Sequence, residues 1–212
     1  MKHMRTLKAA LLSCLCLTLS TVSFAQDTKK ADTKKEATTK TEAKKVETKK
    51  VTIKAIELDV PVTWTVKKSS SSMRLATYAV KPVEGETDEA ELTVFNFPNQ
   101  DIKQNIKRWA DQFSGPKRKS KTVKGKCPTG DYYLVNASGT FKKPKPGSPP
   151  FRRETVDAEG YRMLGVILPV KEKGMYFLKL TGPDKTVAAQ MKLFRASFGG
   201  KKAGEKSFPA DE

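Results

Sequence analysis

Apolar side chains occupy every second position from residue 56 to residue 66, with charged, hydroxyl or proline side chains between them. A period of two is typical of a strand that buries one face, so this stretch predicts a half-buried strand or a bent pair of strands. Pro61 lies inside the stretch and has no amide hydrogen, which indicates a sheet edge or a kink at that point.

Five later segments are rich in apolar side chains on both faces, as expected of strands that are covered on two sides. They span residues 73–80, 91–97, 131–141, 161–170 and 175–181. Together with the first stretch, they predict a mainly antiparallel sheet of about six or seven strands.

Two segments repeat their apolar side chains at helical spacing, and each predicts one amphipathic helix. The apolar stripes consist of Ile102, Ile106, Trp109 and Phe113 in the first segment, and of Val187, Met191, Phe194 and Phe198 in the second. We expect the first helix to be capped by Asn99 and stopped by Gly115-Pro116. We expect the second helix to begin near Asp184 and to end at Gly199-Gly200.

These elements predict one α+β domain over residues 51–200, in which both helices pack on the sheet. About 150 residues are enough for one ordinary hydrophobic core. Trp64, Trp109 and Phe177 are interpreted as core side chains. Residues 201–212 are expected to form a flexible C-terminal tail.

The first 25 residues have the pattern of a secretory signal peptide. Basic residues at positions 2, 5 and 8 precede an apolar run, and Ser23-Phe24-Ala25 places small residues at the positions that a signal peptidase reads. We therefore expect cleavage after Ala25 and an exported protein, either periplasmic or extracellular.

Two alternatives for this segment stay open. An uncleaved membrane anchor needs about 20 mainly apolar residues, and the run here is shorter. A lipid-modified Cys14 would follow from the lipoprotein-like sequence Leu11-Leu12-Ser13-Cys14, although apolar residues continue beyond that cysteine. Cleavage after Ala25 fits both the length of the run and its continuation.

Residues 26–50 differ in composition from the rest of the chain. They repeat Thr, Lys-Lys and single acidic residues, and they contain no aromatic side chain. A segment with so little apolar surface does not offset the entropy of ordering, so we expect a disordered Lys/Thr-rich tether. It is interpreted as a spacer or as an electrostatic contact with anionic envelope polymers, and no transmembrane helix is expected after cleavage.

The expected cleavage removes most of the side chains that familiar active sites require. His3 is the one histidine of the chain, and Cys14 and Cys16 are two of its three cysteines. Without an imidazole, hydrolases of the Ser-His-Asp and Cys-His types are excluded, and zinc enzymes lose their usual ligands. The sequence contains no phosphate-binding loop and no dinucleotide fingerprint, so no cofactor is predicted.

Three remaining candidates for chemistry have simpler structural explanations. Cys127 lies near two lysines that favour its thiolate, but no base accompanies it. Ser114 and Lys117 match the Ser-x-x-Lys spacing of penicillin-binding enzymes, but Pro116 prevents the helix on which that pair depends. The acidic run of residues 84–91 lacks the ligand spacing of a calcium loop and is interpreted as a hydrophilic hairpin, so no metal site is predicted.

Positive charge is the strongest remaining signal. The net charge of +18 falls to about +15 without the leader, and to about +11 without the tether as well. Two basic loops are expected to carry much of it, and such a field attracts polyanions and weakens with salt. The candidate anion-binding residues are Lys117, Arg118, Lys119, Lys121, Lys124 and Lys126 in the first loop, Arg152 and Arg153 in the second, and Arg74 beside the hydroxyls of Ser69 to Ser72.

Four short segments resemble a group of uncharacterised exported bacterial proteins. They are Pro61-Val62-Thr63-Trp64, Ser71 to Arg74, Asn105 to Trp109 and Phe177 to Pro183. More distantly, the strand order and the Pro-x-x-Trp near the first strand are similar to the PsbP and Mog1 fold. That resemblance implies an α-β-α sandwich and, as one alternative for function, an accessory subunit of a membrane complex.

The whole pattern predicts a non-catalytic exported domain that docks through basic residues on an anionic envelope polymer, a lipid surface or an acidic partner protein. Nucleic acid is disfavoured because export removes the protein from the cytoplasm and the basic clusters lack interleaved aromatic side chains. The alternative is a ligand-binding domain or a histidine-independent enzyme that uses carboxylate, Tyr and Lys side chains.

Overall fold

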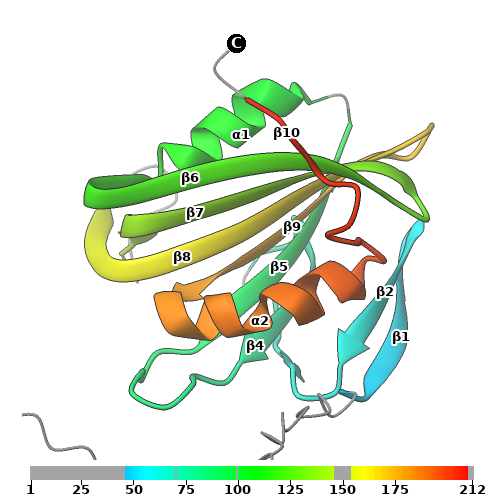
Figure 1. The fold of residues 1–212 in the computed structure, drawn as a ribbon. Coiled ribbons are helices and arrows are strands. Elements are labelled where there is room, and N and C mark those ends of the chain that lie inside the picture. The colour runs from blue at the N-terminus through cyan, green and yellow to red at the C-terminus, as the bar shows by residue number, and fades with distance from the viewer. Residues whose placement is uncertain (1–45, 70, 99, 146–153, 210–212) are drawn as a thin grey trace, which may run out of the picture. The chain divides into compact units, whose positions relative to one another are not determined.

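Eight strands pair side by side in one antiparallel sheet, in the order β10-β6-β7-β8-β9-β5-β4-β3 (Figure 1). The computed structural model describes residues 46–69, 71–98, 100–145 and 154–209, all within the unit from Lys44 to Glu212. The strands of this sheet are β3 (Thr65–Val66), β4 (Arg74–Val80), β5 (Ala90–Phe97), β6 (Phe113–Cys127), β7 (Gly130–Pro144), β8 (Thr155–Val170), β9 (Gly174–Pro183) and β10 (Lys206–Ser207). A separate antiparallel hairpin is formed by β1 (Thr48–Ile53) and β2 (Ile56–Pro61), and the helices are α1 (Ile102–Ala110) and α2 (Asp184–Ser197).

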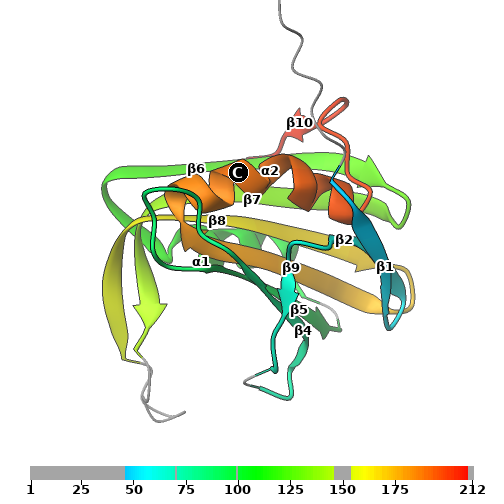
Figure 2. The ribbon, with the colours of Figure 1, turned by 90° about the horizontal axis from the view of Figure 1, so that it is seen from below.

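The two helices lie on opposite faces of the sheet (Figures 1 and 2). Strand β8 shows why, because successive side chains of a strand point to opposite faces. Leu164 packs in the core that contains Phe194 of α2, whereas Met163 packs in the core that contains Trp109 of α1. The predicted α+β class with a mainly antiparallel sheet is therefore confirmed.

The first predicted stretch forms a bent pair of strands, because β2 ends at Pro61 and β3 follows after a turn. The hairpin of β1 and β2 packs its apolar side chains on the α2 side of the sheet. Trp64 is buried, and its Nε1 donates to Oε1 of Gln190 in α2 at 3.1 Å. Trp109 and Phe177 are also buried, so the three predicted core aromatics are confirmed.

Helix α2 follows its predicted range closely, and helix α1 does not. Beyond the end of α2, Gly199 adopts a φ of +74°, which glycine reaches without strain. Helix α1 ends at Ala110, ahead of the Gly-Pro pair expected to stop it, and Phe113 already opens β6. Phe113 is buried in the same core as the apolar residues of α1. The spacing of the apolar residues is therefore the same for a helix that continues to Phe113 and for a helix that ends at Ala110 before a strand.

The cap of α1 also differs from the prediction. The carboxylate of Asp101 caps the helix, with Oδ1 accepting a hydrogen bond from the backbone N–H of Gln104 at 2.7 Å. The expected cap, Asn99, lies outside the described residues.

The main sheet has eight strands instead of the six or seven expected, and β1 and β2 add a second sheet.

The largest correction concerns β6, because the sequence predicts a basic loop there. Residues 115–121 of β6 are all exposed, so they lack the apolar alternation that marks a strand. Among the described residues, only the two-residue β10 borders the outer edge of β6. Lysine side chains on a sheet edge discourage pairing with another chain, which explains a strand of this composition.

Both ends of the domain extend beyond the predicted limits of residues 51 and 200. Strand β1 begins at Thr48, inside the range expected to be a tether. Strand β10 pairs with β6 inside the range expected to be a flexible tail. The ring of Phe208 lies 4.9 Å from that of Tyr133 by centroids, so an aromatic contact holds the last described segment. The predicted leader and the tether up to residue 45 lie outside the described residues.

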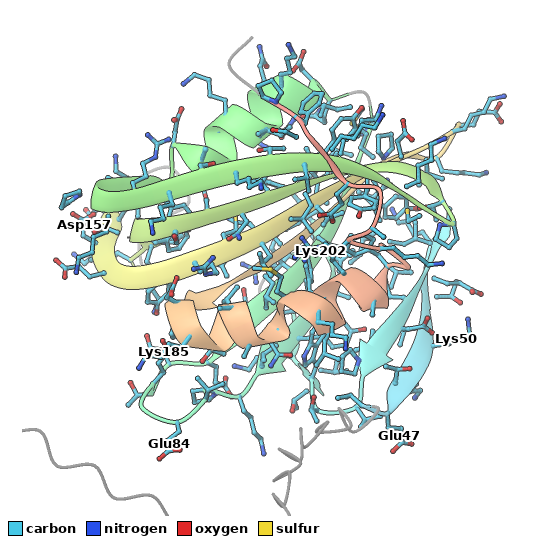
Figure 3. All side chains as sticks on the ribbon, in the orientation of Figure 1. Glu47, Lys50, Glu84, Asp157, Lys185 and Lys202 are labelled. Atoms are coloured by element: carbon cyan, nitrogen blue, oxygen red, sulfur yellow. The ribbon has the colours of Figure 1, made fainter. Side chains whose placement is uncertain are left out.

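The acidic run forms the connection from β4 to β5 and the start of β5, as the hairpin interpretation predicts. Figure 3 shows Glu84 on this connection and Lys185 at the start of α2, both on the outside. Glu86 accepts hydrogen bonds from the backbone N–H groups of Lys185 at 2.9 Å and Thr186 at 2.7 Å, and from the Thr186 hydroxyl at 2.6 Å. Since Pro183 provides no side-chain cap, Glu86 caps α2 from another part of the chain.

We expect Glu86→Ala to lower the free energy of unfolding by about 1 kcal/mol, the usual cost of a lost helix cap. Burial raises the pKa of Glu86, but hydrogen bonds from Thr186 and Lys185 outweigh it and hold the pKa below its ordinary value. The stabilisation is therefore present above the ordinary carboxylate pKa and is lost as the pH falls through the lowered value. Urea denaturation at about pH 7 and about pH 3 measures both effects. An equal loss in the exposed control Glu84→Ala would contradict the capping role.

Candidate functional site

A groove of about 1550 Å³ opens on the face of the sheet that carries α1. Helix α1 has nine residues and spans about 13 Å, so it covers β6 and β7 but leaves part of this face open. The floor of the groove is formed by β9, β5 and β4. Its walls come from α1, from residues 87–91, and from the facing ends of β7 and β8.

The floor changes from apolar to polar along β9. Phe177 packs against Trp109 with ring centroids 5.9 Å apart, and the next two side chains on the same face are Lys179 and Thr181. The strand register places Thr93 of β5 opposite Lys179. A sheet face inside a three-layer protein normally carries apolar side chains, so this polar row distinguishes the floor from the surrounding core.

Lys179 is a half-buried amine without a counter-ion in the described part of the chain. Its Nζ donates a hydrogen bond to Oε1 of Gln112 and lies 5.3 Å from the centroid of the Phe141 ring. Burial, reinforced by the positive charges of Arg108 and Arg74, lowers the pKa of Lys179 to about 8. The floor therefore holds a lysine whose charge is only partly stabilised by its surroundings.

Thr181 supplies a second group whose hydrogen bonding is incomplete. Its Oγ1 is buried and has no hydrogen-bond partner among the described residues. Buried hydroxyls nearly always have a partner, so this oxygen is suited to bond a ligand in the groove.

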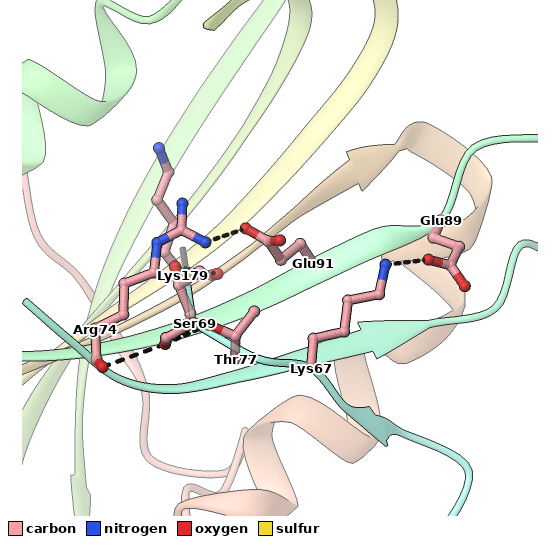
Figure 4. Close-up of polar contacts among 8 residues, drawn as sticks. Lys67, Ser69, Arg74, Thr77, Glu89, Glu91 and Lys179 are labelled. Atoms are coloured by element: carbon pink, nitrogen blue, oxygen red, sulfur yellow. Dashed lines mark hydrogen bonds and ion pairs between the residues drawn. The ribbon is translucent and has the colours of Figure 1, made fainter. Parts of the chain in front are cut away.

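Two arginines lie close to the floor, from β4 and from α1. Nη1 of Arg74 donates to Oε1 of Glu91 at 2.8 Å, and Arg74 and Lys179 extend beside each other into the same region (Figure 4). Arg108 is exposed, and its Nη2 donates to Oδ1 of Asn105, a buried side chain of the preceding turn. Arg108 therefore has an orienting partner but no neutralising one among the described residues.

A hydrogen-bonded trio closes one end of the groove. The hydroxyl of Tyr161 donates to Oδ2 of Asp88 at 2.6 Å, and Nζ of Lys143 lies 3.3 Å from that hydroxyl. The hydrogen bond from Tyr161 and the charge of Lys143 hold the pKa of Asp88 below its ordinary value. A hydrogen bond from Lys107 likewise outweighs burial and lowers the pKa of Asp111. These two carboxylates are ionised at neutral pH, whereas a general acid needs a raised pKa.

The charges that line the groove do not balance. Eight basic and five acidic side chains line it, which leaves an excess of three positive charges. Every acidic one is paired, in Lys67–Glu89, Arg74–Glu91, Lys107–Asp111, Lys143–Asp88 and Lys145–Glu154. Arg108, Lys142 and Lys179 form no ion pair within the described residues, and we refer to these three as the groove cations.

Among the candidate anion-binding residues predicted from the sequence, only Arg74 lines the groove. Those between positions 117 and 126 lie along β6, where Arg118 pairs with Asp111 at 3.4 Å and Lys124 pairs with Asp131 at 2.8 Å. The other four form no ion pair in the described part of the chain and are called the β6 lysines, namely Lys117, Lys119, Lys121 and Lys126. Arg152 and Arg153 lie outside the described residues.

The structure does not bring together the serine hydroxyls and Arg74 as an anion grip. Oγ of Ser69 donates to the backbone oxygen of Arg74 at 3.3 Å, while the guanidinium turns to Glu91. Ser70 lies outside the described residues.

The two nucleophile candidates have local partners. Sγ of Cys127 lies 3.1 Å from Oγ1 of Thr129. Ser114, which the sequence places at a helix end, lies in β6, and its hydroxyl donates to the backbone oxygen of Thr140 at 3.4 Å. In the described residues neither side chain has a basic group positioned to activate it.

Two searches of the described residues bear on other classes of site. No three His, Cys, Asp or Glu side chains in that part of the chain are grouped as metal ligands. No described helix has both the length and the apolar sequence needed to cross a membrane.

One residue of the groove stands out in the sequence, although it is not among the candidate anion-binding residues. Lys179 is a single charge in the run Phe177-Leu178-Lys179-Leu180-Thr181, which is otherwise apolar or hydroxyl-bearing on both faces. In addition, the three segments Ser71 to Arg74, Asn105 to Trp109 and Phe177 to Pro183 meet at the groove. They contribute Arg74, the pair Asn105 and Arg108, and the pair Lys179 and Thr181.

No protein-family model matches the chain, and no curated protein sequence matches it. The function is therefore inferred from the chemistry of the groove.

Proposed function

We propose that this protein is an exported, non-catalytic domain that binds an anionic ligand in the groove. The observation that carries the proposal is the unbalanced charge. Within the described residues, every carboxylate of the lining has a cation while the groove cations have no carboxylate. A carboxylate or phosphate group of a ligand completes this arrangement with charge-assisted hydrogen bonds.

The position of Lys179 strengthens the proposal. A partly buried ammonium without a counter-ion destabilises the fold, and a bound anion offsets that cost. Each hydrogen bond to a charged group contributes about 1.5–3 kcal/mol, so two or three of them are enough for specific binding. Thr181 adds a hydroxyl that has no partner among the described residues.

The β6 lysines support a second candidate, docking on an anionic envelope polymer, a lipid surface or an acidic partner protein. They extend along an exposed strand edge and lack ion pairs in the described residues. An exposed row of this kind attracts polyanions over a long range but holds a single anionic group weakly. We therefore assign the specific contact to the groove and a salt-sensitive attraction to β6.

Two broader alternatives are kept as proposals. The PsbP and Mog1 resemblance, with its accessory role in a membrane complex, is supported by helices on both faces of an antiparallel sheet. An enzyme that works without histidine is supported by the Lys, Tyr and carboxylate side chains of the groove, although Asp88 and Asp111 have lowered pKa values. Export itself is proposed on the leader pattern of residues 1–25.

Citrate is a suitable probe because it offers up to three carboxylates to the groove cations. We expect the full chain to bind citrate at about pH 7 in isothermal titration calorimetry, and we expect Arg108→Gln or Lys179→Met to weaken binding by about tenfold or more. The double variant Lys119→Gln/Lys121→Gln removes the same kind of charge from β6 and is expected to change citrate affinity less than about twofold.

The reverse pattern would assign binding to the strand edge. If the β6 variant lost citrate binding and both groove variants kept it, the groove proposal would be wrong and docking through β6 would replace it. Retention on immobilised heparin, measured in the same variants over a salt series, separates long-range attraction from the specific site.

A further inference from the structure

The surroundings of Lys179 suit an amine that reacts, as well as one that binds by charge. Its nitrogen has an amide oxygen and an aromatic ring as neighbours and no carboxylate within ion-pairing distance among the described residues. Arg108 and Arg74 place further positive charge near it. Desolvation and nearby cations are the two conditions that make a lysine nucleophilic, because both favour the neutral amine.

We propose that Lys179 forms a reversible imine with an oxo acid, a ligand that carries a carbonyl group together with a carboxylate. The inference rests on the proposed function, because Arg108 must hold the carboxylate while Lys179 attacks the carbonyl. A carboxylate at the exposed guanidinium of Arg108 and a carbonyl at the deeper amine would use both groups in one ligand.

The chemical step needs no oxidant or reductant. The lone pair of the neutral amine attacks the carbonyl carbon, the C–N bond forms, and the carbonyl oxygen takes up a proton to give a carbinolamine. The nitrogen loses one proton at this stage, and its lone pair then expels the hydroxyl, which takes up a proton and leaves as water. Loss of the remaining proton from the nitrogen leaves the C=N bond of the imine. The hydroxyl of Thr181 lies on the same face of β9 and has no partner among the described residues, so it is suited to bond the oxygen of the carbinolamine. A pKa of about 8 leaves a substantial neutral fraction of Lys179 near neutral pH.

Reductive trapping tests the inference directly. The full chain is incubated with glyoxylate and cyanoborohydride at about pH 7.5, and labelled lysines are quantified by peptide mapping. Lys192 of α2 is exposed and has no ion pair among the described residues, so it serves as the internal reference. We expect labelling of Lys179 to exceed that of Lys192 by about tenfold or more. Similar labelling of the two lysines would overturn the inference.

Propanal is the control for the carboxylate, because it has a carbonyl group and no charge. We expect the ratio of Lys179 to Lys192 labelling to be several times higher with glyoxylate than with propanal, and Arg108→Gln to remove that difference. Equal ratios for the two probes would overturn the assignment to oxo acids. Citrate binding without selective trapping would leave the proposed function standing and reject the imine. Absence of both would reject the two together.

Discussion

Lys179→Met is expected to make the protein more stable and to weaken its binding of citrate by about tenfold or more. Methionine is an unbranched side chain only one heavy atom shorter than lysine, and it removes a charge that the fold stabilises poorly. The pKa of Lys179 falls from 10.5 to about 8 on folding, a shift equivalent to about 3 kcal/mol. Because the variant also leaves Gln112 without its hydrogen-bond donor, we expect a net gain of about 1–3 kcal/mol in the free energy of unfolding at pH 7.

The pH dependence of this gain follows from the direction of the shift. A lysine whose folded pKa lies below its unfolded value destabilises the folded state fully at pH values below about 8. The penalty shrinks as the pH rises from about 8 to about 10.5 and is absent above that range. The stabilities of wild type and Lys179→Met should therefore converge at high pH. Citrate affinity of the wild type should begin to fall as the pH rises through about 8, where the folded protein loses the charge of this amine and with it an attraction for the anion.

Urea denaturation across this pH range measures the gain, and Lys192→Met is the matched control for loss of an exposed lysine. A control that gained as much stability as Lys179→Met would show a general effect of lowered net charge. A Lys179→Met variant less stable than wild type would contradict the account, because it would mean that the amine is well satisfied in the fold. A gain in stability with a loss of binding is the pattern expected of a residue kept for function.

The elements that the sequence predicts correctly are those whose burial repeats with a simple period. Helix α2 and the central strands β5, β8 and β9 have apolar side chains wherever they meet a core, so their patterns survive in the structure. Strand β6 has no such pattern over residues 115–121, because the side chains there face water and the strand is defined by its pairing with β7. Short β10 is held by contacts with β6, and no local pattern encodes such contacts.

The candidate site was harder to predict than the fold because its charges come together only in three dimensions. The basic clusters are visible in the sequence since their lysines are consecutive, but consecutive residues of a strand edge spread along a surface. Arg108 and Lys179 lie far apart in the sequence, and the short helix α1 and the register of β9 bring them to one groove. The detectable signal was Lys179 itself, a charge where the strand pattern requires an apolar residue.

Glu205→Ala is expected to cause the largest loss of stability among the substitutions considered, about 3 kcal/mol or more in the free energy of unfolding. Glu205 and Arg195 form an ion pair at 2.7 Å in which the side chains are only 7% and 13% exposed. Oε1 of Glu205 also accepts a hydrogen bond from the hydroxyl of Tyr132 at 2.8 Å. Removal of this one carboxylate leaves a buried guanidinium without its counter-ion. It also leaves the Tyr132 hydroxyl with the backbone oxygen of Lys201, at 3.1 Å, in place of a charged acceptor.

The same carboxylate holds the last described segment on the sheet, because β10 follows it directly and pairs with β6. We therefore expect Glu205→Ala to release residues 206–209 as well, and hydrogen exchange at the backbone amide of Phe208, which donates to Thr122 at 3.0 Å, reports that release. Lys202→Ala, an exposed neighbour, is the control and is expected to change stability by less than about 0.5 kcal/mol. In the double variant Arg195→Met/Glu205→Leu no charge remains buried, so much of the lost stability should return. A Glu205→Ala variant with wild-type stability in urea denaturation would show that the pair contributes little, and the attachment of the C-terminal segment would then have to rest on Phe208 and the β10 pairing alone.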